Sequence, residues 1–167
     1  RPAMIVVSNT SPLTSLAAIG QFDLLHRLYG ELHIAQGVRE ELNASGKRWP
    51  GRDEVDSAEW IEHHTVQNRA LVTALERDLD RGEAETIALT LELKADLVLL
   101  DEREGRRAAQ RFGLRVIGVV GILLDAKSHG VIKAVRPYLE ALRQTAGFYL
   151  SDTVYDGVLL LASESDG

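Results

Sequence analysis

The sequence predicts a three-layer α/β/α sandwich around a central, mainly parallel sheet. Two short apolar runs, residues 4–7 and 97–100, show no alternation with polar residues, which is typical of strands buried on both faces. Helical spacing follows each run, and strands that alternate with helices favour a parallel sheet with right-handed crossovers. The chain has 167 residues, a length typical of one domain with a single hydrophobic core.

The first apolar run stops at polar residues, and a helix is expected directly after it. Ser11 followed by Pro12 indicates the helix start, because a capping hydroxyl precedes a proline that suits the first turn. Gly20 indicates the helix end. The elements expected in the rest of the N-terminal half are a helix at residues 22–28, a strand at 31–35, a helix at 38–42, a loop at 47–56 and a strand at 60–66.

The C-terminal half continues the alternation around the second apolar run. The expected elements are helices at residues 71–75 and 83–93, the strand at 97–100, a helix at 102–112, a strand at 116–120 that runs into a helix, and helices at 134–142 and 153–162. No repeat interrupts the pattern, so we expect one domain over residues 4–164. Residues 1–3 precede Met4, the expected natural start, and we interpret them as a cloning remnant.

The composition narrows the class of protein. A hydrophobic fraction of 45% and a charged fraction of 26% are ordinary for a soluble globular protein. The absence of cysteine excludes disulfides and thiolate zinc sites and agrees with a reducing compartment. No apolar run reaches the roughly 18–20 residues that span a bilayer, so the expected location is the cytoplasm. The net charge of −6 argues against a general nucleic-acid coat protein.

Polar side chains follow both apolar strands, at the sheet edge where open parallel sheets bind ligands. Asn9 lies just past the first strand and Asp101 just past the second. If the two strands are neighbours, about 4.8 Å apart, these side chains converge. Each also has a structural interpretation, because Asn9 can close a local turn and Asp101 can cap a helix.

Four glutamates on two expected helices are further candidates. Glu83 can join the site from a helix start, but the aspartate three residues before it completes a capping box in which Glu83 supports the helix end. Glu85, two residues on, points elsewhere, and we expect it to be solvated. Glu40 and Glu41 lie on a short amphipathic helix, where a solvated face is the simplest interpretation.

Four segments contain these polar residues. They are Ser8-Asn9-Thr10-Ser11-Pro12-Leu13, Gly37-Val38-Arg39-Glu40-Glu41-Leu42, Gly82-Glu83-Ala84-Glu85-Thr86-Ile87-Ala88-Leu89, and Leu99-Leu100-Asp101-Glu102 with Arg106-Arg107. As an ordered set they resemble the motifs of PIN domains, in the branch similar to the virulence-associated toxin C ribonucleases of prokaryotic toxin-antitoxin pairs. The resemblance runs from residue 4 to about residue 164 and includes residues 116–121 and 148–151.

The resemblance implies a PIN-like fold of Rossmann-like topology and the activity of a metal-dependent endoribonuclease, a hydrolase that uses a metal-activated water. It implies that the metal ligands, which are also the catalytic residues, are Asn9, Glu41, Glu83 and Asp101. Oxygen ligands of this kind select hard cations, and the expected cofactor is Mg²⁺ or Mn²⁺. A toxin would have an RNA substrate and an antitoxin protein as partners.

A basic stretch begins directly after Asp101. Residues 103–143 include nine basic and three acidic side chains. Arg103, Arg106 and Arg107 at its start are therefore expected to hold an RNA backbone beside the acidic site. A solvated helix face is the alternative.

One candidate ligand departs from the family pattern, because Asn9 stands where most PIN domains have aspartate. An amide oxygen coordinates a cation without contributing charge, and a unit charge pair at ~4 Å is worth about 4 kcal/mol at an effective dielectric constant of 20. The alternative function is therefore a catalytically weak or inactive PIN-fold module that binds RNA or protein.

Other readings of the sequence are weaker. The first strand-to-helix turn lacks the glycines of a dinucleotide site. The five histidines are scattered, and His63 and His64 would face opposite sides of a strand, so neither a zinc site nor a nucleophilic triad is indicated. The apolar run at residues 158–161 is wider than one buried stripe, which favours docking to an antitoxin or to a second copy in a homodimer, with simple burial as the alternative.

Overall fold

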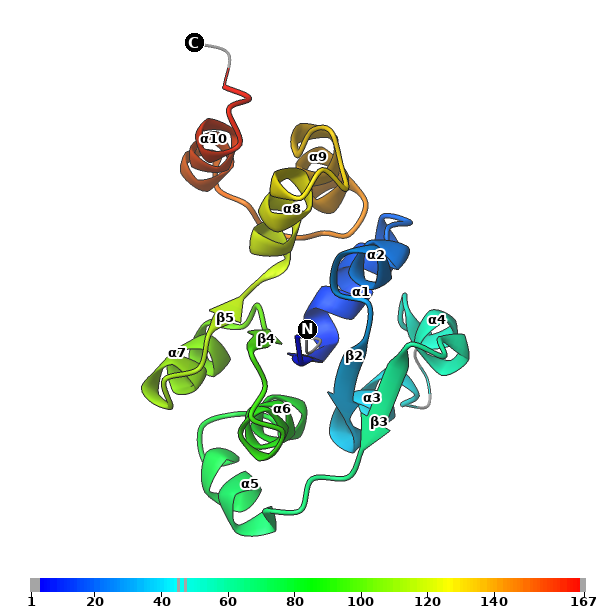
Figure 1. The fold of residues 1–167 in the computed structure, drawn as a ribbon, viewed down its shortest axis with the longest axis vertical. Coiled ribbons are helices and arrows are strands. Elements are labelled where there is room, and N and C mark those ends of the chain that lie inside the picture. Colours follow the sequence, from blue (N-terminus) through cyan, green and yellow to red (C-terminus); the bar gives the residue numbers. More distant parts are fainter. Residues whose placement is uncertain (1–3, 45, 47, 166–167) are drawn as a thin grey trace.

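The structure is a computed structural model that describes residues 4–44, 46 and 48–165; residues 1–3, interpreted as a cloning remnant, lie outside the described residues. Five parallel strands form a sheet in the order β3-β2-β1-β4-β5 (Figure 1). The strands are β1 (Val6–Ser8), β2 (Leu32–Ala35), β3 (Ile61–His64), β4 (Leu97–Leu99) and β5 (Val116–Ile117). The predicted parallel sheet is confirmed.

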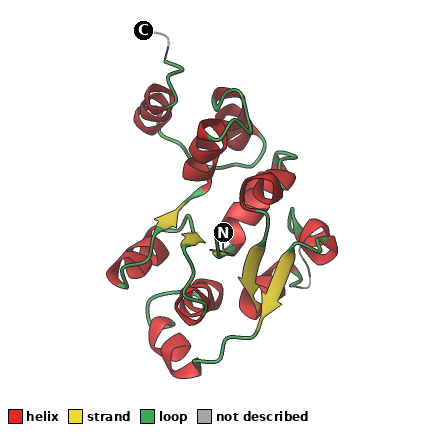
Figure 2. Cartoon of the chain, in the orientation of Figure 1, coloured by secondary structure: helices red, strands yellow, loops and turns green. Residues whose placement is uncertain are grey.

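Helices cover both faces of this sheet and extend beyond one end of it (Figure 2). In the described part of the chain they are α1 (Thr10–Ala18), α2 (Asp23–Tyr29), α3 (Gln36–Leu42), α4 (Arg52–Ser57), α5 (Arg69–Leu75), α6 (Arg81–Glu92), α7 (Arg103–Arg111), α8 (Val119–Ser128), α9 (Arg136–Gln144) and α10 (Asp152–Leu161). None of these helices is both long and apolar enough to cross a membrane.

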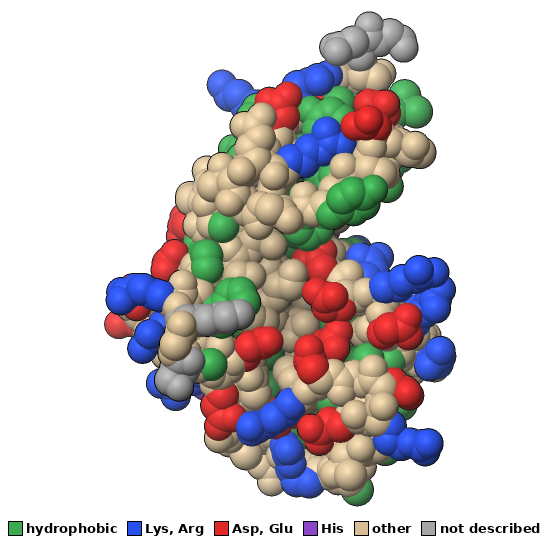
Figure 3. All heavy atoms as spheres, turned by 180° about the vertical axis from the view of Figure 1, so that it is seen from behind, with side chains coloured by type: hydrophobic (Ala, Val, Ile, Leu, Met, Phe, Trp, Pro, Cys, Tyr) green, Lys and Arg blue, Asp and Glu red, His purple; other side chains and the backbone are tan. Residues whose placement is uncertain are grey.

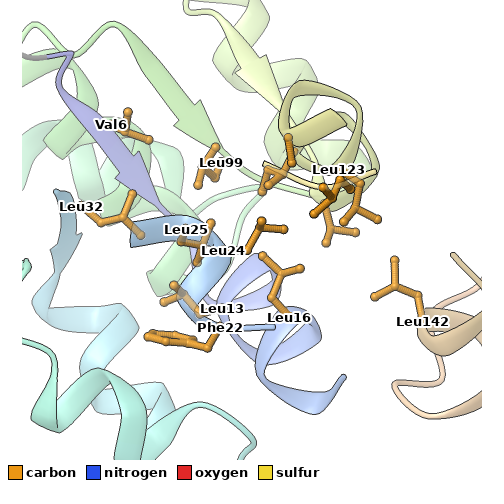
Figure 4. Close-up of a cluster of buried hydrophobic side chains, with 14 of the residues drawn as sticks. Val6, Leu13, Leu16, Phe22, Leu24, Leu25, Leu32, Leu99, Leu123 and Leu142 are labelled. Atoms are coloured by element: carbon orange, nitrogen blue, oxygen red, sulfur yellow. The ribbon is translucent and has the colours of Figure 1, made fainter. Parts of the chain in front are cut away.

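Alternation along the buried strands separates two hydrophobic cores. Val6 and Leu99 face one core, whereas their neighbours Val7 and Val98 face the other. The first core is completed by leucines of α1, α2, α8 and α9 (Figure 4). The second is completed by apolar side chains of α5, α6 and α7. Strands buried on both faces are the reason that these runs are apolar throughout, and the predicted three layers are confirmed.

Two predicted local features are wrong. Residues 47–56 were expected to form a loop, but α4 begins at Arg52 and buries Val55 against the first core; tertiary packing overrides weak local propensity here. The first helix begins at Thr10, with Asn9 at the N-cap position, so it starts earlier than the Ser11-Pro12 signal indicates. Pro12 is tolerated because its missing N–H belongs to the unpaired first turn.

The apolar run on the last helix is divided between two environments. Val158 and Leu159 are buried against α8 and its neighbours, whereas Leu160 and Leu161 are 68% and 76% exposed. Figure 1 shows α8, α9 and α10 grouped at one end of the molecule. Simple burial therefore accounts for half of this run and leaves an apolar edge on α10.

Candidate active site

Neighbouring strands bring the first two candidate side chains to one edge of the sheet. β1 pairs with β4, with Ser8 opposite Leu99, and the backbone N–H of Asn9 donates to the Leu99 carbonyl oxygen at 2.9 Å. Asn9 and Asp101 therefore leave adjacent strands at their carboxyl ends, as the two apolar runs predict. Asn9 is 4% exposed.

The amide of Asn9 faces helix α6. Its side chain makes no capping hydrogen bond to α1; instead its Oδ1 accepts a hydrogen bond from the Thr86 hydroxyl at 3.3 Å. A Cβ atom placed on Gly82, in the first turn of α6, would lie 3.5 Å from Asn9 Oδ1 and 3.3 Å from Glu41 Oε1. Glu41 reaches this point from α3, where its Oε1 also accepts a hydrogen bond from Thr10 at 2.5 Å. Both candidate ligand oxygens thus lie within 3.5 Å of the space that a side chain at Gly82 would fill.

Glu83 uses one carboxylate oxygen in the cap of α6 and directs the other toward α7. The predicted capping box is present: the Asp80 backbone N–H donates to Glu83 Oε1 at 3.1 Å, and the Glu83 N–H donates to Asp80 Oδ1 at 2.8 Å. The other oxygen, Oε2, lies 2.9 Å from where a Cβ atom would stand on Gly105. Burial, together with the charges of Asp80 and Glu102, raises the pKa of Glu83 to about 7 against the opposing backbone hydrogen bond.

Asp101 is held from two sides. Its Oδ1 accepts a hydrogen bond from the backbone N–H of Val119 at the start of α8 (2.9 Å), and its Oδ2 accepts one from the Ser11 hydroxyl (3.4 Å). Burial raises the pKa of Asp101, while the Val119 N–H and the positive charge of Arg106 lower it. A Cβ atom on Gly118 would overlap Asp101 Oδ1 and lie 3.0 Å from an Arg106 nitrogen.

Glycines at these contacts are a feature that the sequence reasoning missed. Gly82, Gly105 and Gly118 each leave room that an oxygen of a candidate ligand occupies. The signal was present in the glycine that opens the Gly82-Glu83 segment, but its meaning depends on which side chains the fold brings opposite. The hydroxyls of Thr10 and Thr86 were likewise missed as partners of the site.

Acidic side chains gather across the middle of one face, beside the notch between the C-terminal helices and the rest of the molecule (Figure 3). Of the three arginines expected to bind RNA, Arg106 is half-buried beside Asp101, whereas Arg103 and Arg107 are exposed on α7. Arg107 also pairs with Glu104 at 3.6 Å. Of these three arginines, Arg106 is therefore the one that lies beside a candidate ligand.

The expectation that Glu85 is solvated is wrong. Glu85 is fully buried and pairs with Arg81 at 2.9 Å and with Arg69 at 3.1 Å. Glu85 is buried because α3 and α5 both pack against α6. Glu40 does lie on an exposed face, where it pairs with Arg81.

The donor set suits a hard cation. The groups that could hold it are one amide oxygen and the carboxylates of Glu41, Glu83 and Asp101, which are the ligand types of Mg²⁺ and Mn²⁺. No three carboxylates at this end of the sheet come within 4.8 Å of one another among the described residues. That spacing agrees with Mg²⁺, which keeps several waters and takes one or two protein carboxylates.

A family model described as a PIN domain matches residues 5–164, nearly the whole chain. A search of curated proteins finds no match.

Proposed function

The chain belongs to the PIN-domain family, and from this premise we propose that it is a metal-dependent endoribonuclease, the toxin of a prokaryotic toxin-antitoxin pair. PIN domains are generally metal-dependent nucleases, so the family and the fold both support nuclease chemistry. The RNA substrate, the toxin role and the Mg²⁺ or Mn²⁺ cofactor are the proposed refinements.

The observation that carries the proposal is the approach of two side-chain oxygens to Gly82, at the start of α6. Asn9 from β1 and Glu41 from α3 direct their side-chain oxygens to Gly82, and Glu83 is the next residue. Asp101 follows the adjacent strand β4. Four segments far apart in the sequence thus place oxygen donors at one end of the sheet, where open parallel sheets bind ligands.

Each residue has a role that its contacts support. A bound cation would supply an activated water and neutralise charge on the leaving oxygen of the phosphodiester. Asp101 and Glu83 would hold the cation, and the Val119 N–H and Ser11 hydroxyl keep the Asp101 carboxylate oriented. Arg106 offers a guanidinium beside Asp101 that can bind a phosphate oxygen.

Cleavage of single-stranded RNA by the purified protein tests the proposal. We expect cleavage with Mg²⁺ or Mn²⁺ and none with EDTA. Asp101→Asn should lower the rate about 100-fold or more, because it removes a charged ligand. The exposed Glu76→Gln, at the end of α5, is the matched control and should cut like the wild type. Wild-type protein that is folded and loaded with metal yet leaves RNA intact would contradict the proposal.

A second function, a PIN-fold module that binds RNA or protein with little cleavage, is favoured by one observation. Asn9 brings no charge to the site, and its Oδ1 already accepts the Thr86 hydroxyl. A protein of this kind would bind single-stranded RNA in filter binding but leave it uncut with either metal. Metal-dependent turnover distinguishes the two functions.

The exposed edge of α10 is the surface we propose for an antitoxin or a second copy. Leu160 and Leu161 would bury their apolar area there, which stabilises association. Mass measurement by light scattering on the purified protein, and on the complex co-purified from the native host, tests this. A Leu160→Ser/Leu161→Ser variant should lose the larger mass; an unchanged mass would place the contact elsewhere.

A further inference from the structure

Two histidines and a glutamate converge on the second and third strands of the sheet. β2 and β3 pair with His33 opposite Glu62, and His64 lies two residues after Glu62 on the same side of β3. His33 Nδ1 is 2.9 Å from His64 Nε2 and 3.5 Å from Glu62 Oε2, and His64 Nε2 is 3.7 Å from Glu62 Oε1. In the described chain no other three histidine or acidic side chains come this close.

A carboxylate also lies beside the second ring nitrogen of His33, Nε2. Glu31 Oε1 lies 3.2 Å from His33 Nε2, on the far side of the ring from His64. When Nε2–H donates to Glu31, the neutral imidazole presents the lone pair of Nδ1 toward His64 and Glu62. A carboxylate that orients the second nitrogen in this way is the usual partner of a metal-binding histidine.

We propose that His33, His64 and Glu62 form a second metal site, which takes a zinc-class divalent cation. Two donors bound to one tetrahedral ion at about 2.0–2.2 Å lie about 3.3–3.6 Å apart. The separations of 3.5 and 3.7 Å between the histidines and Glu62 are close to this range, and the two ring nitrogens, 2.9 Å apart, would move apart by about 0.4 Å to share the ion. Two imidazoles and a carboxylate form a donor set for Zn²⁺ that leaves one position for water. The preference is opposite to that of the oxygen donors at the candidate active site.

The position of the site indicates what the ion would do. β3 is the edge strand, hydrogen-bonded to β2 alone among the described strands. An ion held by His33 on β2 and by Glu62 and His64 on β3 would stabilise the pairing of this edge strand with β2. The site is reachable, because the Glu62 side chain is 57% exposed and His64 lines two surface hollows.

A hydrogen-bonded histidine pair without metal is the competing explanation, in which His64 donates to His33. Burial is the largest cause lowering the pKa of His33, which favours the neutral ring that either explanation requires. The two explanations differ in whether added Zn²⁺ binds these residues.

Calorimetric titration of tag-free protein with Zn²⁺, in excess Mg²⁺ to occupy oxygen-only sites, decides between them. We expect one Zn²⁺ per chain, a higher melting temperature on Zn²⁺ addition, and a visible absorption band when Co²⁺ replaces Zn²⁺. His64→Gln and Glu62→Gln should each weaken binding about tenfold or more. His63→Gln is the matched control, because His63 is exposed on the opposite face of β3 and should bind Zn²⁺ like the wild type.

The outcomes separate this site from the candidate active site. Zn²⁺ uptake that Asp101→Asn removes and His64→Gln leaves intact would overturn the proposal, as would equal affinity in His63→Gln and His64→Gln. Glu62 is exposed, so we expect Glu62→Gln to retain the fold. Its Zn²⁺ affinity therefore tests the site even if His64→Gln unfolds. RNA cleavage takes no part in the measurement, so loss of the nuclease proposal leaves this test unaffected.

Discussion

The buried carboxylate of Glu85 accepts a hydrogen bond from the backbone N–H of Gly37 at 2.8 Å, which joins α6 to the first turn of α3. The same carboxylate pairs with Arg81 and Arg69. Because α3 carries Glu41, this bond helps to place a candidate ligand that Glu85 does not touch. A Cβ atom on Gly37 would lie 3.0 Å from a Glu85 oxygen, so a larger residue there would push against this contact.

Replacement of Glu85 by Gln should lower the free energy of unfolding by about 1–3 kcal/mol, because charge-assisted hydrogen bonds are lost in a buried position. The loss stays below that of a fully buried ion pair, since both arginines are about half exposed and can rehydrate. Urea denaturation measures it, with Glu76→Gln as the exposed control. Equal stability of the two variants would show that the buried pair contributes nothing.

The stability contributed by Glu85 should depend on pH in an acidic window. Hydrogen bonds from Arg81, Gly37 and Arg69 lower its pKa, although burial, the largest single influence, opposes them. A lowered folded-state pKa gives stability that is complete above the unfolded value of about 4.3 and is lost as pH falls through the folded value. The stability difference between wild type and Glu85→Gln should thus be constant from pH 7 to 5 and shrink below. A difference that grows on acidification would refute the assignment.

Glu83 should show the opposite pH dependence in metal-free protein. Its pKa is raised to about 7, so between about pH 4.3 and pH 7 the folded state holds a proton that the unfolded state has lost, and stability falls as pH rises through this window. Glu83→Gln preserves the capping box and removes the titration. In EDTA the melting temperature of the variant, relative to that of the wild type, should rise from pH 5 to pH 8. Added Mg²⁺ should reduce this rise. A melting-temperature difference that does not change with pH would contradict the raised pKa of Glu83.

Asn9→Asp tests the missing charge at the candidate active site. The variant should bind Mn²⁺ about tenfold or more tightly than the wild type and cut RNA faster, because a charged ligand replaces a neutral one. Without metal it should be less stable, since it buries a carboxylate near Glu41. Calorimetric titration with Mn²⁺ measures the affinity, and the exposed Asn68→Asp serves as control. Unchanged Mn²⁺ affinity would remove Asn9 from the ligand set.

Gly118→Ala tests the room that glycines leave for the ligands. The added methyl group would overlap Asp101 Oδ1, so we expect RNA cleavage to fall about tenfold or more through a misplaced carboxylate. Gly157→Ala on α10 is the matched control, because its added methyl meets nothing within 4 Å; this helix position should gain up to about 1 kcal/mol. Equal activities in the two variants would argue that Asp101 has freedom to move.

The apolar pattern predicted the layers well because a parallel strand that is buried on both faces has apolar residues at every position. The runs containing Val6 and Val98 are apolar for this reason, and they identified the two strands whose ends carry Asn9 and Asp101. The capping box at Glu83 was also predictable, since its partners are three residues apart.

Contacts between segments distant in sequence could not be read in this way. Glu85 is buried because α3 happens to cover its side of α6, and His33 meets His64 because β2 and β3 pair in one register out of several. The sequence by itself determined the order of the strands and of every helix except α4, through local periodicity and short-range hydrogen bonding, and the resemblance to PIN domains supplied the candidate ligands. The tertiary structure alone decided which of those side chains meet, because strand register and helix packing are set by the whole core.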